Sequence, residues 1–562
     1  MLLFFGALTH ASAANAPTFQ NPIAVENAQP GTSAWQAHVG GDIAVYATEI
    51  TAAPGEEVDF HVSTANRYRL VVYRLGWYGG DGARQMACVP SCGADEQGTP
   101  QPQPGAPPTS PTDPPIRADW PVTDVVRTGR NWTSGYYLAE AVLTSGPKAG
   151  LVATTYFIVH VPAASVGSPI LVQVPVNTWE AYNHWGGKSL YDSLGPRMYR
   201  VSFQRPFDDQ AQSPLWWEIQ AVRFLEREGY DVSYQTDLDT DRDPTSLLRH
   251  RLVMVLGHDE YWTRSMRDAF DNAVAQGTNL AFLGANEGYW HIEYQDNGQT
   301  IFGYKSLYDP NPVLEEKTAL WRQIGRPDCN LTGVSTISVT TVPRSLDYTV
   351  TPDGVHDTWF MNTGLAAGDT IPSVVGREHD VLNPNPPSCQ HPGLTVLFHY
   401  DGGGVDQDAD AVKFTTPSGA RVFAAGAMSF AWGLDDYRAD GTLVRTPPGG
   451  SAGQSDPRLQ QFMRNALDDL TRPAPPAALS ATTAGDAMTV SIAPSTDPRV
   501  QGFVAALQRP NGTWRLICRA VVSTSCSGTA PRRPGVYAVA AGTVDLWHRR
   551  SAPTRITVRY QP

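Results

Sequence analysis

A histidine and two acidic residues follow the most apolar stretch of the chain. Leu252–Gly257 reads LVMVLG, and His258, Asp259 and Glu260 come next, directly before a pattern typical of a helix. On an extended segment His258 and Glu260 are spaced i, i+2, so both side chains point to one face and can reach one site. A histidine can transfer protons, and a carboxylate can act as a base or bind a metal. Exit loops are often polar, however, and Asp259 can instead complement the dipole of a helix that begins near Trp262.

Two other apolar segments also end in polar clusters. Residues 169–175 are followed by side chains that carry polar donors or acceptors, namely Asn177, Tyr182, Asn183 and His184. Residues 279–284 are followed by Asn286 and Glu287. In an open parallel sheet the carboxyl ends of the strands meet at one edge, and ligands bind there. These polar exits therefore predict a functional site at that edge.

The middle of the chain shows the alternation that would build such a sheet. The apolar spacing predicts strands at 169–175, 230–236, 252–257 and 279–287, with helices at 215–229 and 262–277. A further strand with its exit loop is expected at 421–434, and a closing helix at 457–470. We therefore expect an α/β domain over residues 166–471 with a central, mostly parallel sheet of the glutamine-amidotransferase or flavodoxin-like kind.

Two β-rich regions flank this domain. Residues 15–165 contain short strand patterns separated by turn residues, which is typical of an immunoglobulin-like β-sandwich. The linker RPAPPAA at 472–478 leads to residues 479–562, which read as a fibronectin-like β-sandwich. The predicted fold class is thus multi-domain α/β plus β, with a sandwich at each end.

Bulk properties narrow the range of partners and compartments. The length of 562 residues suits about three domains, and the net charge of −13 argues against nucleic acid or an anionic membrane as a partner. The start MLLFFGALTHASAANAP resembles a signal peptide cleaved after about residue 14, with an apolar run too short to span a membrane. We expect a secreted or periplasmic protein without a membrane span, whose oligomeric state is open.

The six cysteines fall into three local pairs: Cys88 with Cys92, Cys329 with Cys389, and Cys518 with Cys526. This distribution predicts three disulfides in an oxidising compartment. Zinc binding at Cys88 and Cys92 is the competing interpretation, but the spacing offers neither a second such pair nor a nearby histidine. A Cys329–Cys389 bridge would close a loop of about 60 residues and fix the segment that carries Glu378.

The middle of the chain resembles a known family through a set of motifs. They are VNTWEAYNHWGGKSLY (176–191), VSFQRPF (201–207), EIQAVRFLEREGYDVSYQTDLD (218–239), GHDEYWT (257–263), FLGANEGYW (282–290), GLAAGDTIPSVVGREHD (364–380) and RVFAAGAMSFAWGLD (421–435). Together they resemble the catalytic domain of the large (beta) subunit of N,N-dimethylformamidase, and SGYYLAEAV (134–142) fits the sandwich that accompanies it.

That resemblance implies a mononuclear ferric iron, Fe(3+), held by two tyrosines and a glutamate. Glu260 takes the carboxylate position and Tyr182 the position of one tyrosine. Tyr137 is the expected second tyrosine, with Tyr136 and Tyr191 as competitors.

The resemblance also implies three further residues beside the metal. His258 and Asn286 match the histidine and the asparagine that line the family's site, and Glu378 is placed as the second glutamate. All three are the expected catalytic residues of this chain.

The chemistry of these residue types agrees with the resemblance. Phenolate and carboxylate are hard, anionic oxygen ligands that suit a trivalent iron. The metal would act as a Lewis acid on a carbonyl, Glu378 or His258 as general base, and Asn286 as a donor to the developing oxyanion. We expect an exported hydrolase of an amide carbon–nitrogen bond, acting on a small amide or a larger, peptide-like one.

Other functions remain open at this point. The chain contains no His-Glu-x-x-His and no phosphate loop. A glycosidase could use Asp259, Glu260 and Glu378. The main alternative is a secreted carbohydrate- or polymer-binding protein with a non-catalytic α/β domain, supported by two sandwiches and abundant tryptophan, including Trp179, Trp185, Trp216, Trp217 and Trp290. Core packing is the simpler interpretation of Trp216 and Trp217.

Overall fold

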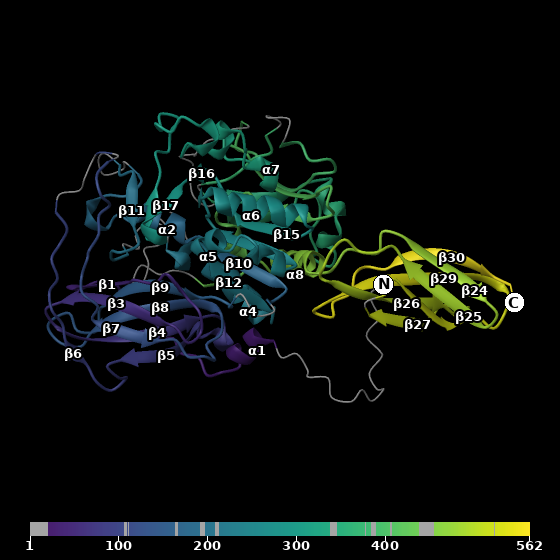
Figure 1. Ribbon diagram of the computed structural model, residues 1–562, viewed down its shortest axis with the longest axis horizontal. Helices are drawn as coiled ribbons and strands as arrows, with labels where there is room; N and C mark the ends of the chain where they lie inside the picture. The colour runs from purple at the N-terminus through teal and green to yellow at the C-terminus, as the bar shows by residue number, and fades with distance from the viewer. Residues whose placement is uncertain are drawn as a thin grey trace. The chain divides into compact units, whose positions relative to one another are not determined.

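The computed structural model describes residues 21–105, 110, 112–162, 167–191, 197–207, 213–337, 346–376, 378–383, 389–404, 407–437, 455–521 and 523–561. The predicted signal peptide, residues 1–14, lies outside the described residues. Contacts divide the described chain into two units, one within Gln20–Leu467 and the other within Asp468–Pro562. Strands outnumber helices in both units (Figure 1).

The N-terminal part of the larger unit is a β-sandwich. One sheet has the order β1 (Ile43–Ala47), β3 (Glu57–Thr64), β7 (Asp124–Arg127). The other has the order β2 (Thr51–Ala52), β9 (Val152–Val159), β8 (Gly135–Leu143), β4 (Arg67–Leu75), β5 (Ala83–Val89), with β6 (Glu96–Gln97) beside β4. Side chains from both sheets, such as Phe60, Val72, Tyr137 and Phe157, form one core.

The second half of this unit is built on a nine-stranded sheet. Its order is β12 (Val232–Thr236), β10 (Ile170–Val174), β13 (Leu252–Gly257), β15 (Asn279–Gly284), β23 (Arg421–Ala424), β22 (Ala409–Thr415), β21 (Thr395–Tyr400), β19 (Leu346–Val350), β20 (Thr370–Val375). Pairing is parallel from β12 to β23 and antiparallel from β23 to β20. The prediction of a mostly parallel sheet of the glutamine-amidotransferase or flavodoxin-like kind is therefore wrong for the sheet as a whole.

Short connections explain the antiparallel half. β21, β22 and β23 follow one another with only a few residues between them. Such links can join antiparallel neighbours, whereas a parallel pair needs a longer crossover. The parallel strands do have long connections, which contain the helices α2 (Val176–Tyr182), α3 (Pro214–Trp217), α4 (Ile219–Arg227), α5 (Asp237–Arg242) and α6 (Arg264–Ala275).

The predicted helix 215–229 is interrupted. It is split into α3 and α4 at Glu218, which has φ −115°. The Glu218 carboxylate accepts hydrogen bonds from Tyr136 Oη at 2.6 Å and from Trp179 Nε1 at 2.8 Å. A buried carboxyl group with two hydrogen-bond donors thus lies where the apolar spacing alone predicts one continuous helix. Helix α4 ends before Gly229, whose φ is +73°.

Helix α6 follows the predicted pattern closely. Thr263 caps it by accepting the backbone N–H of Met266, and Gly277 follows its end with φ +83°. Its buried side chains, including Met266 and Phe270, pack against Val253 and Phe282 of the sheet. Helix α8 (Pro457–Leu470) has the bounds predicted for the closing helix.

Small elements complete this half of the unit. They are α1 (Pro22–Asn27), α7 (Cys329–Thr332), the sheet β11 (Arg200–Ser202), β18 (Thr300–Phe302), β17 (Glu293–Gln295), and the parallel pair β14 (Tyr261–Trp262) and β16 (Trp290–His291). Among the described residues, no helix is long and apolar enough to cross a membrane.

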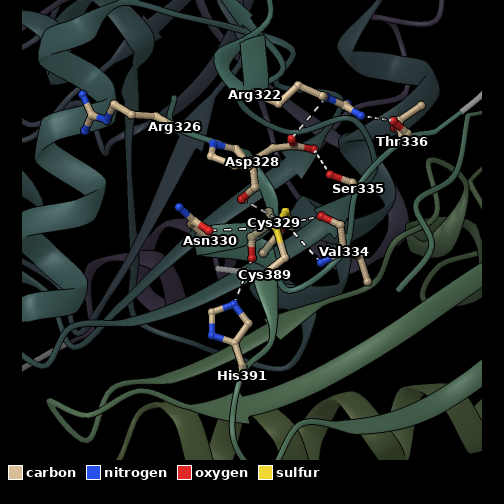
Figure 2. Close-up of a disulfide and its surroundings, with 12 residues drawn as sticks. Arg322, Arg326, Asp328, Cys329, Asn330, Val334, Ser335, Thr336, Cys389 and His391 are labelled. Atoms are coloured by element: carbon tan, nitrogen blue, oxygen red, sulfur yellow. Dashed lines mark hydrogen bonds and ion pairs between the residues drawn. A yellow bond between two sulfur atoms is a disulfide. The ribbon is translucent and has the colours of Figure 1, made fainter. Parts of the chain in front are cut away.

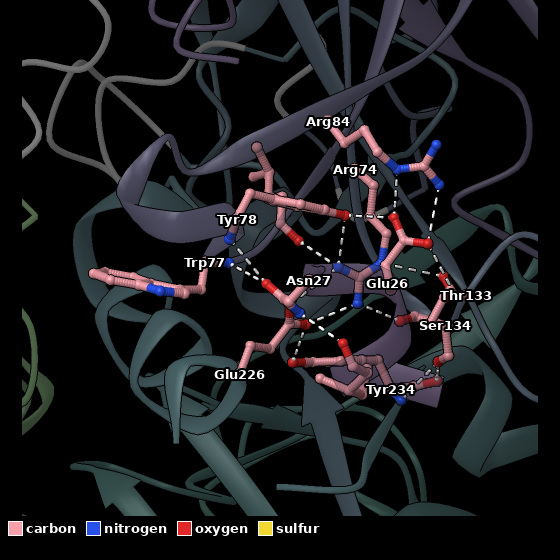
Figure 3. Close-up of polar contacts among 12 residues, drawn as sticks. Glu26, Asn27, Arg74, Trp77, Tyr78, Arg84, Thr133, Ser134, Glu226 and Tyr234 are labelled. Carbon is pink, nitrogen blue, oxygen red and sulfur yellow. Dashed lines mark hydrogen bonds and ion pairs between the residues drawn. The ribbon is translucent and has the colours of Figure 1, made fainter. Parts of the chain in front are cut away.

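A buried ion pair joins the sandwich to the α/β half (Figure 3). Arg74 of β4 donates to both carboxylate oxygens of Glu226 in α4, at 2.8 and 3.0 Å, and both side chains are 0% exposed. Tyr234 Oη donates to the same carboxylate at 3.0 Å, and Asn27 of α1 donates to it at 2.7 Å. The two halves therefore share a polar interior, and neither is an independent module.

The smaller unit is a second β-sandwich. One sheet has the order β24 (Leu479–Ala484), β25 (Ala487–Ile492), β28 (Ser525–Thr529), and the other β27 (Trp514–Val521), β26 (Val500–Gln508), β29 (Gly535–Asp545), β30 (Thr554–Tyr560). Cys518 and Cys526 form a disulfide between the two sheets. The other two predicted disulfides, Cys88–Cys92 and Cys329–Cys389, are also present, and their presence rules out zinc at Cys88 and Cys92.

Candidate functional site

The turn after β13 brings the candidate residues to the sheet edge. Gly257 has φ +74°, a left-handed conformation that favours glycine, and a Cβ at this position would approach Glu218 Cγ to 2.8 Å. The chain then reaches β14, and α6 begins only at Arg264. Asp259 therefore lies outside the first turn of that helix, and the dipole interpretation of this residue is wrong.

Three oxygen atoms meet at the carboxyl ends of β10 and β13. Tyr182 ends helix α2, and its Oη donates to Glu260 Oε2 at 3.0 Å. Tyr191 Oη lies 2.7 Å from Glu260 Oε2 and 2.7 Å from Tyr182 Oη. The backbone N–H of Glu260 donates to Thr178 Oγ1 of α2 at 2.9 Å, which holds the two segments together. The site thus has two phenol oxygens and one carboxylate oxygen in mutual contact.

His258 lies between two carboxylates beside this group. Its Nε2 is 3.0 Å from Glu378 Oε2 and 3.4 Å from Glu260 Oε2, and its Nδ1 is 2.8 Å from the carbonyl oxygen of Ala285. Burial lowers the pKa of this histidine, but the charges of Glu378 and Glu260 outweigh burial and raise the pKa well above 6.5. The Nε2 side of the His258 ring thus faces two carboxylates, and the Nδ1 side faces a backbone carbonyl.

Asn286 completes the group from the end of β15. Its Nδ2 donates to Glu378 Oε2 at 3.2 Å, so Glu378 contacts both His258 and Asn286. The structure therefore brings together five of the six residues chosen from the sequence: Tyr182, His258, Glu260, Asn286 and Glu378.

Tyr137 lies elsewhere. It is 0% exposed in the core of the N-terminal sandwich, stacked on Trp132 at 5.0 Å, with its Oη bonded to the carbonyl of Thr133 at 2.8 Å. Tyr136 points to the other face of β8 and donates to Glu218. Of the three candidates for the second tyrosine, Tyr191 lies with Tyr182 and Glu260, whereas Tyr137 and Tyr136 lie apart from them.

Three side chains that the sequence analysis did not select also surround the oxygens. Tyr261 Oη donates to Tyr191 Oη at 2.7 Å, and Lys305 Nζ donates to Tyr261 Oη at 2.7 Å. Lys305 Nζ also lies 3.5 Å from the centre of the Tyr191 ring, close enough for a cation–π contact. Trp290 Nε1 donates to Glu260 Oε1 at 2.9 Å. Tyr261 and Trp290 lie within the motifs that carry the family resemblance, whereas no pattern marks Lys305.

Buried acids lie behind the site. Asp259 is 0% exposed, and Gln173 Nε2 donates to Asp259 at 3.4 Å and to Asp237 at 3.0 Å. Burial raises the pKa of Asp259 to about 7, and burial together with Asp259 raises the pKa of Asp237 well above 3.8. Glu287 accepts the backbone N–H of Asp259 at 2.9 Å. These groups shape the turn that carries His258 and Glu260.

The donor set fits a hard trivalent cation. Burial, followed by the charge of Glu260, raises the pKa values of Tyr182 and Tyr191 well above 10, so both phenols keep their protons unless a strong positive charge faces them. Two phenolates and one carboxylate would balance three positive charges. The described residues contain no group of three His, Cys, Asp or Glu side chains placed to hold a metal.

The tryptophans offered as a sign of polymer binding are mostly structural. Trp179 bonds to Glu218, Trp216 and Trp217 are buried, and Trp217 stacks on Trp432 at 5.2 Å. Trp290 contacts the candidate site through Glu260.

The fold and the site together define a class: a sandwich fused to an α/β half, with a tyrosine–carboxylate group at the carboxyl ends of its parallel strands. Residues 69–442 match the model of a family described as N,N-dimethylformamidase beta subunit-like, C-terminal. The chain belongs to this family.

Curated relatives agree at lower coverage. The N,N-dimethylformamidase beta subunit of an Alcaligenes species is 28% identical over 148 residues, which are 23% of this chain and 19% of the relative. That of Paracoccus aminophilus is 27% identical over 146 residues, again 23% of this chain and 19% of the relative. The chain thus matches about a fifth of the length of each relative.

A fibronectin type III-like protein from Clostridium thermocellum is similar in structure to a smaller part of the chain. It is 17% identical over 16% of this chain and 95% of that protein, with a TM-score of 0.14, which is too low to argue from.

Proposed function

We propose that this protein is an iron-dependent hydrolase of amide carbon–nitrogen bonds. The observation that carries the proposal is the contact of the Tyr182, Tyr191 and Glu260 oxygens within 3.0 Å of one another, with His258 beside them. Family membership supports a related hydrolase.

The three oxygens would hold a ferric ion. When bound, such an ion supplies Lewis-acid polarisation of a substrate carbonyl and lowers the pKa of a coordinated water. Tyr182 and Tyr191 lose their protons on binding, so occupancy should rise with pH. Tyr261 positions the Tyr191 phenol by a hydrogen bond, and Lys305 positions it by a cation–π contact with its ring.

Glu378 and His258 are placed to move protons. In the proposed reaction, Glu378 takes a proton from the attacking water as the new carbon–oxygen bond forms. The carbon–nitrogen bond then breaks, and the Glu378–His258 pair returns a proton to the departing nitrogen, so the products are a carboxylic acid and an amine. The short contact of 3.0 Å between His258 Nε2 and Glu378 Oε2 supports a shared proton. Asn286 Nδ2 can donate to the oxyanion that develops at the carbonyl.

Export and a small or peptide-like amide substrate are part of the same proposal. The three disulfides support an oxidising compartment. Burial of most of the site residues favours a substrate of which only the amide group reaches the oxygens.

The test is metal analysis combined with absorption spectroscopy of purified protein with intact disulfides. We expect about one iron per chain, a visible band from phenolate-to-iron charge transfer, and release of amine from a panel of N-substituted formamides and acetamides. Glu260→Gln should lose most of the iron, because the carboxylate charge is one of three that balance the metal. Glu378→Gln should keep both iron and band but lose hydrolysis.

A matched control is Glu140→Gln. Glu140 is a buried glutamate in the sandwich whose pKa is raised well above 4.5 by burial, so a neutral amide should replace it with iron and activity unchanged. Stoichiometric zinc, iron undiminished in Glu260→Gln, or hydrolysis by metal-free protein would overturn the proposal.

A further inference from the structure

Asn286 adopts a backbone conformation that needs external support. Its φ is +63°, in the left-handed region that asparagine adopts at some cost. Gly284, the last residue of β15, and Gly288 lie two residues before and two residues after Asn286. The direction of the Asn286 side chain, and therefore its 3.2 Å contact with Glu378, depends on this conformation being held.

Asp380 supplies the support. Both of its carboxylate oxygens face the backbone N–H of Asn286, at 3.0 and 3.2 Å. The hydroxyl of Thr336 donates to the same carboxylate. Asp380 is only 3% exposed, and its own backbone is fixed by hydrogen bonds with Gly426 and Asp410, each at 2.9 Å. The buried carboxylate of Asp380, whose backbone is fixed, therefore holds the backbone of Asn286 in the turn that sets the direction of the Asn286 side chain.

The segment around Ser335 and Thr336, which contacts Asp380 and its neighbour Val381, is held by further polar contacts (Figure 2). Ser335 pairs with Val381 as an isolated β-bridge, and Ser335 Oγ donates to Asp328 at 2.6 Å. Arg322 Nη1 donates to the carbonyl of Thr336 at 2.8 Å. The Cys329–Cys389 disulfide closes the loop that contains both Thr336 and Asp380. Thr336 and Asp380, which lie near opposite ends of this closed loop, are thus in direct contact.

We infer that Asp380 is a positioning residue: it holds Asn286 in its left-handed conformation and thereby sets the Asn286–Glu378 contact. The inference rests on the proposed function for its catalytic consequence, but its geometric content is independent of the reaction. Asp380 touches neither the phenol oxygens nor Glu260 in any described contact, so it acts through Asn286 and leaves the metal group unchanged.

A double-mutant cycle tests whether Asp380 acts through Asn286. Asp380→Ala should lower kcat by about 10- to 100-fold, the range typical of residues that orient catalytic groups, with KM little changed. Asn286→Ala should lower kcat by at least as much. If Asp380 acts only through Asn286, Asp380→Ala adds nothing further in the Asn286→Ala background. Asp380→Asn keeps an acceptor oxygen for Asn286 and should restore most of the turnover. Additive losses, or no rescue by asparagine, would overturn the inference.

A second readout does not depend on activity. In a crystal structure of Asp380→Ala, Asn286 should leave the left-handed region and lose its contact with Glu378, while Tyr182, Tyr191 and Glu260 stay together. A retained φ near +63° at Asn286 would overturn the inference even if the protein proved to be no hydrolase.

Asp410→Ala is the matched control. Asp410 is also a buried aspartate, and its carboxylate accepts the backbone N–H of Leu382 at 2.9 Å and lies 2.8 Å from His399 Nδ1, away from Asn286. This variant should lose stability but keep kcat and the Asn286 conformation. If it lowers kcat as much as Asp380→Ala does, the effect is general loosening of the loop and the inference fails. A wild-type protein without hydrolysis but with the expected structural change in Asp380→Ala would reject the proposed function alone.

Discussion

The phenol oxygen of Tyr191 lies 2.7 Å from Glu260 Oε2, although 69 residues separate the two in the sequence. Tyr191 follows α2, which leaves the carboxyl end of β10, and Glu260 follows β13, the parallel neighbour of β10. The contact therefore depends on strand pairing and not on local sequence. It also makes Tyr191 a stronger candidate ligand than any tyrosine of the sandwich.

Replacing the site tyrosines should separate ligands from core residues. Tyr191→Phe and Tyr182→Phe each remove one phenol oxygen next to Glu260, so we expect iron affinity to fall by at least about tenfold and the visible band to weaken or shift. Tyr137→Phe removes only a bond to the carbonyl of Thr133, so it should cost about 1 kcal/mol of stability and leave the iron unchanged. Metal titration with absorption spectra measures both. An unaltered band in Tyr191→Phe together with iron loss in Tyr137→Phe would restore the sandwich tyrosine as ligand.

Removing one partner of the buried Arg74–Glu226 pair should be costly. Arg74→Met leaves the Glu226 carboxylate buried without its cation, so we expect the free energy of unfolding to fall by about 3–5 kcal/mol. Arg127→Met breaks a pair with Glu57 in which the two side chains are 69% and 52% exposed. This variant should change the free energy of unfolding by less than about 1 kcal/mol. Urea unfolding of both variants gives the comparison. Equal effects would show that the buried pair has no special role.

Glu218 should make stability depend on pH. Burial raises its pKa to about 8, so the folded state holds this proton at pH values where the unfolded chain has released it. The folded state binds more protons between about pH 4.5 and 8, and the free energy of unfolding therefore decreases as pH rises through that window. Glu218→Gln cannot ionise and should lose less stability between pH 5 and 8, by up to about 4 kcal/mol. Parallel pH profiles of the variant and the wild type would contradict this.

The two disulfides of the larger unit should differ in their contribution to stability. Cys329 and Cys389 are separated by 60 residues and Cys88 and Cys92 by 4. In the chain-entropy model, closing these loops is worth about 4 and about 2 kcal/mol respectively. Paired Cys→Ala variants, compared by chemical unfolding, should therefore rank in that order. The reverse ranking would mean that native-state effects dominate over loop length.

The strand exits were predictable because they depend on topology. Apolar runs identify β10, β13 and β15, and parallel strands bring their exit loops to one edge of the sheet. His258 and Glu260 could therefore be placed together before any contact was known. Asn286 can be placed by the same rule, although its left-handed backbone could not be read from the sequence.

The position of Tyr191 beside Tyr182 and Glu260 was not predictable in this way. Tyr136 and Tyr137 are adjacent in β8 and point to opposite faces, and both faces of this strand are buried. The alternation of side chains along β8 therefore cannot show from burial whether Tyr136 or Tyr137 faces the site. Tyr191 follows a 3-10 turn after α2, where no periodic pattern fixes the direction of a side chain. The break between α3 and α4 at Glu218 was also not predictable, because the hydrogen-bond partners of Glu218, Tyr136 and Trp179, are distant in sequence.

The shared interior of the larger unit has a consequence for inheritance. An α/β half separated from its sandwich would expose Glu226 without Arg74 and Glu218 without Tyr136, in a surface built to be covered. Gene rearrangements that replace the N-terminal part of the protein should therefore be tolerated only when they leave β4, which carries Arg74, and β8, which carries Tyr136, in place. The family match begins at residue 69, inside β4 and ahead of Arg74, so it includes both Arg74 and Tyr136 together with the α/β half.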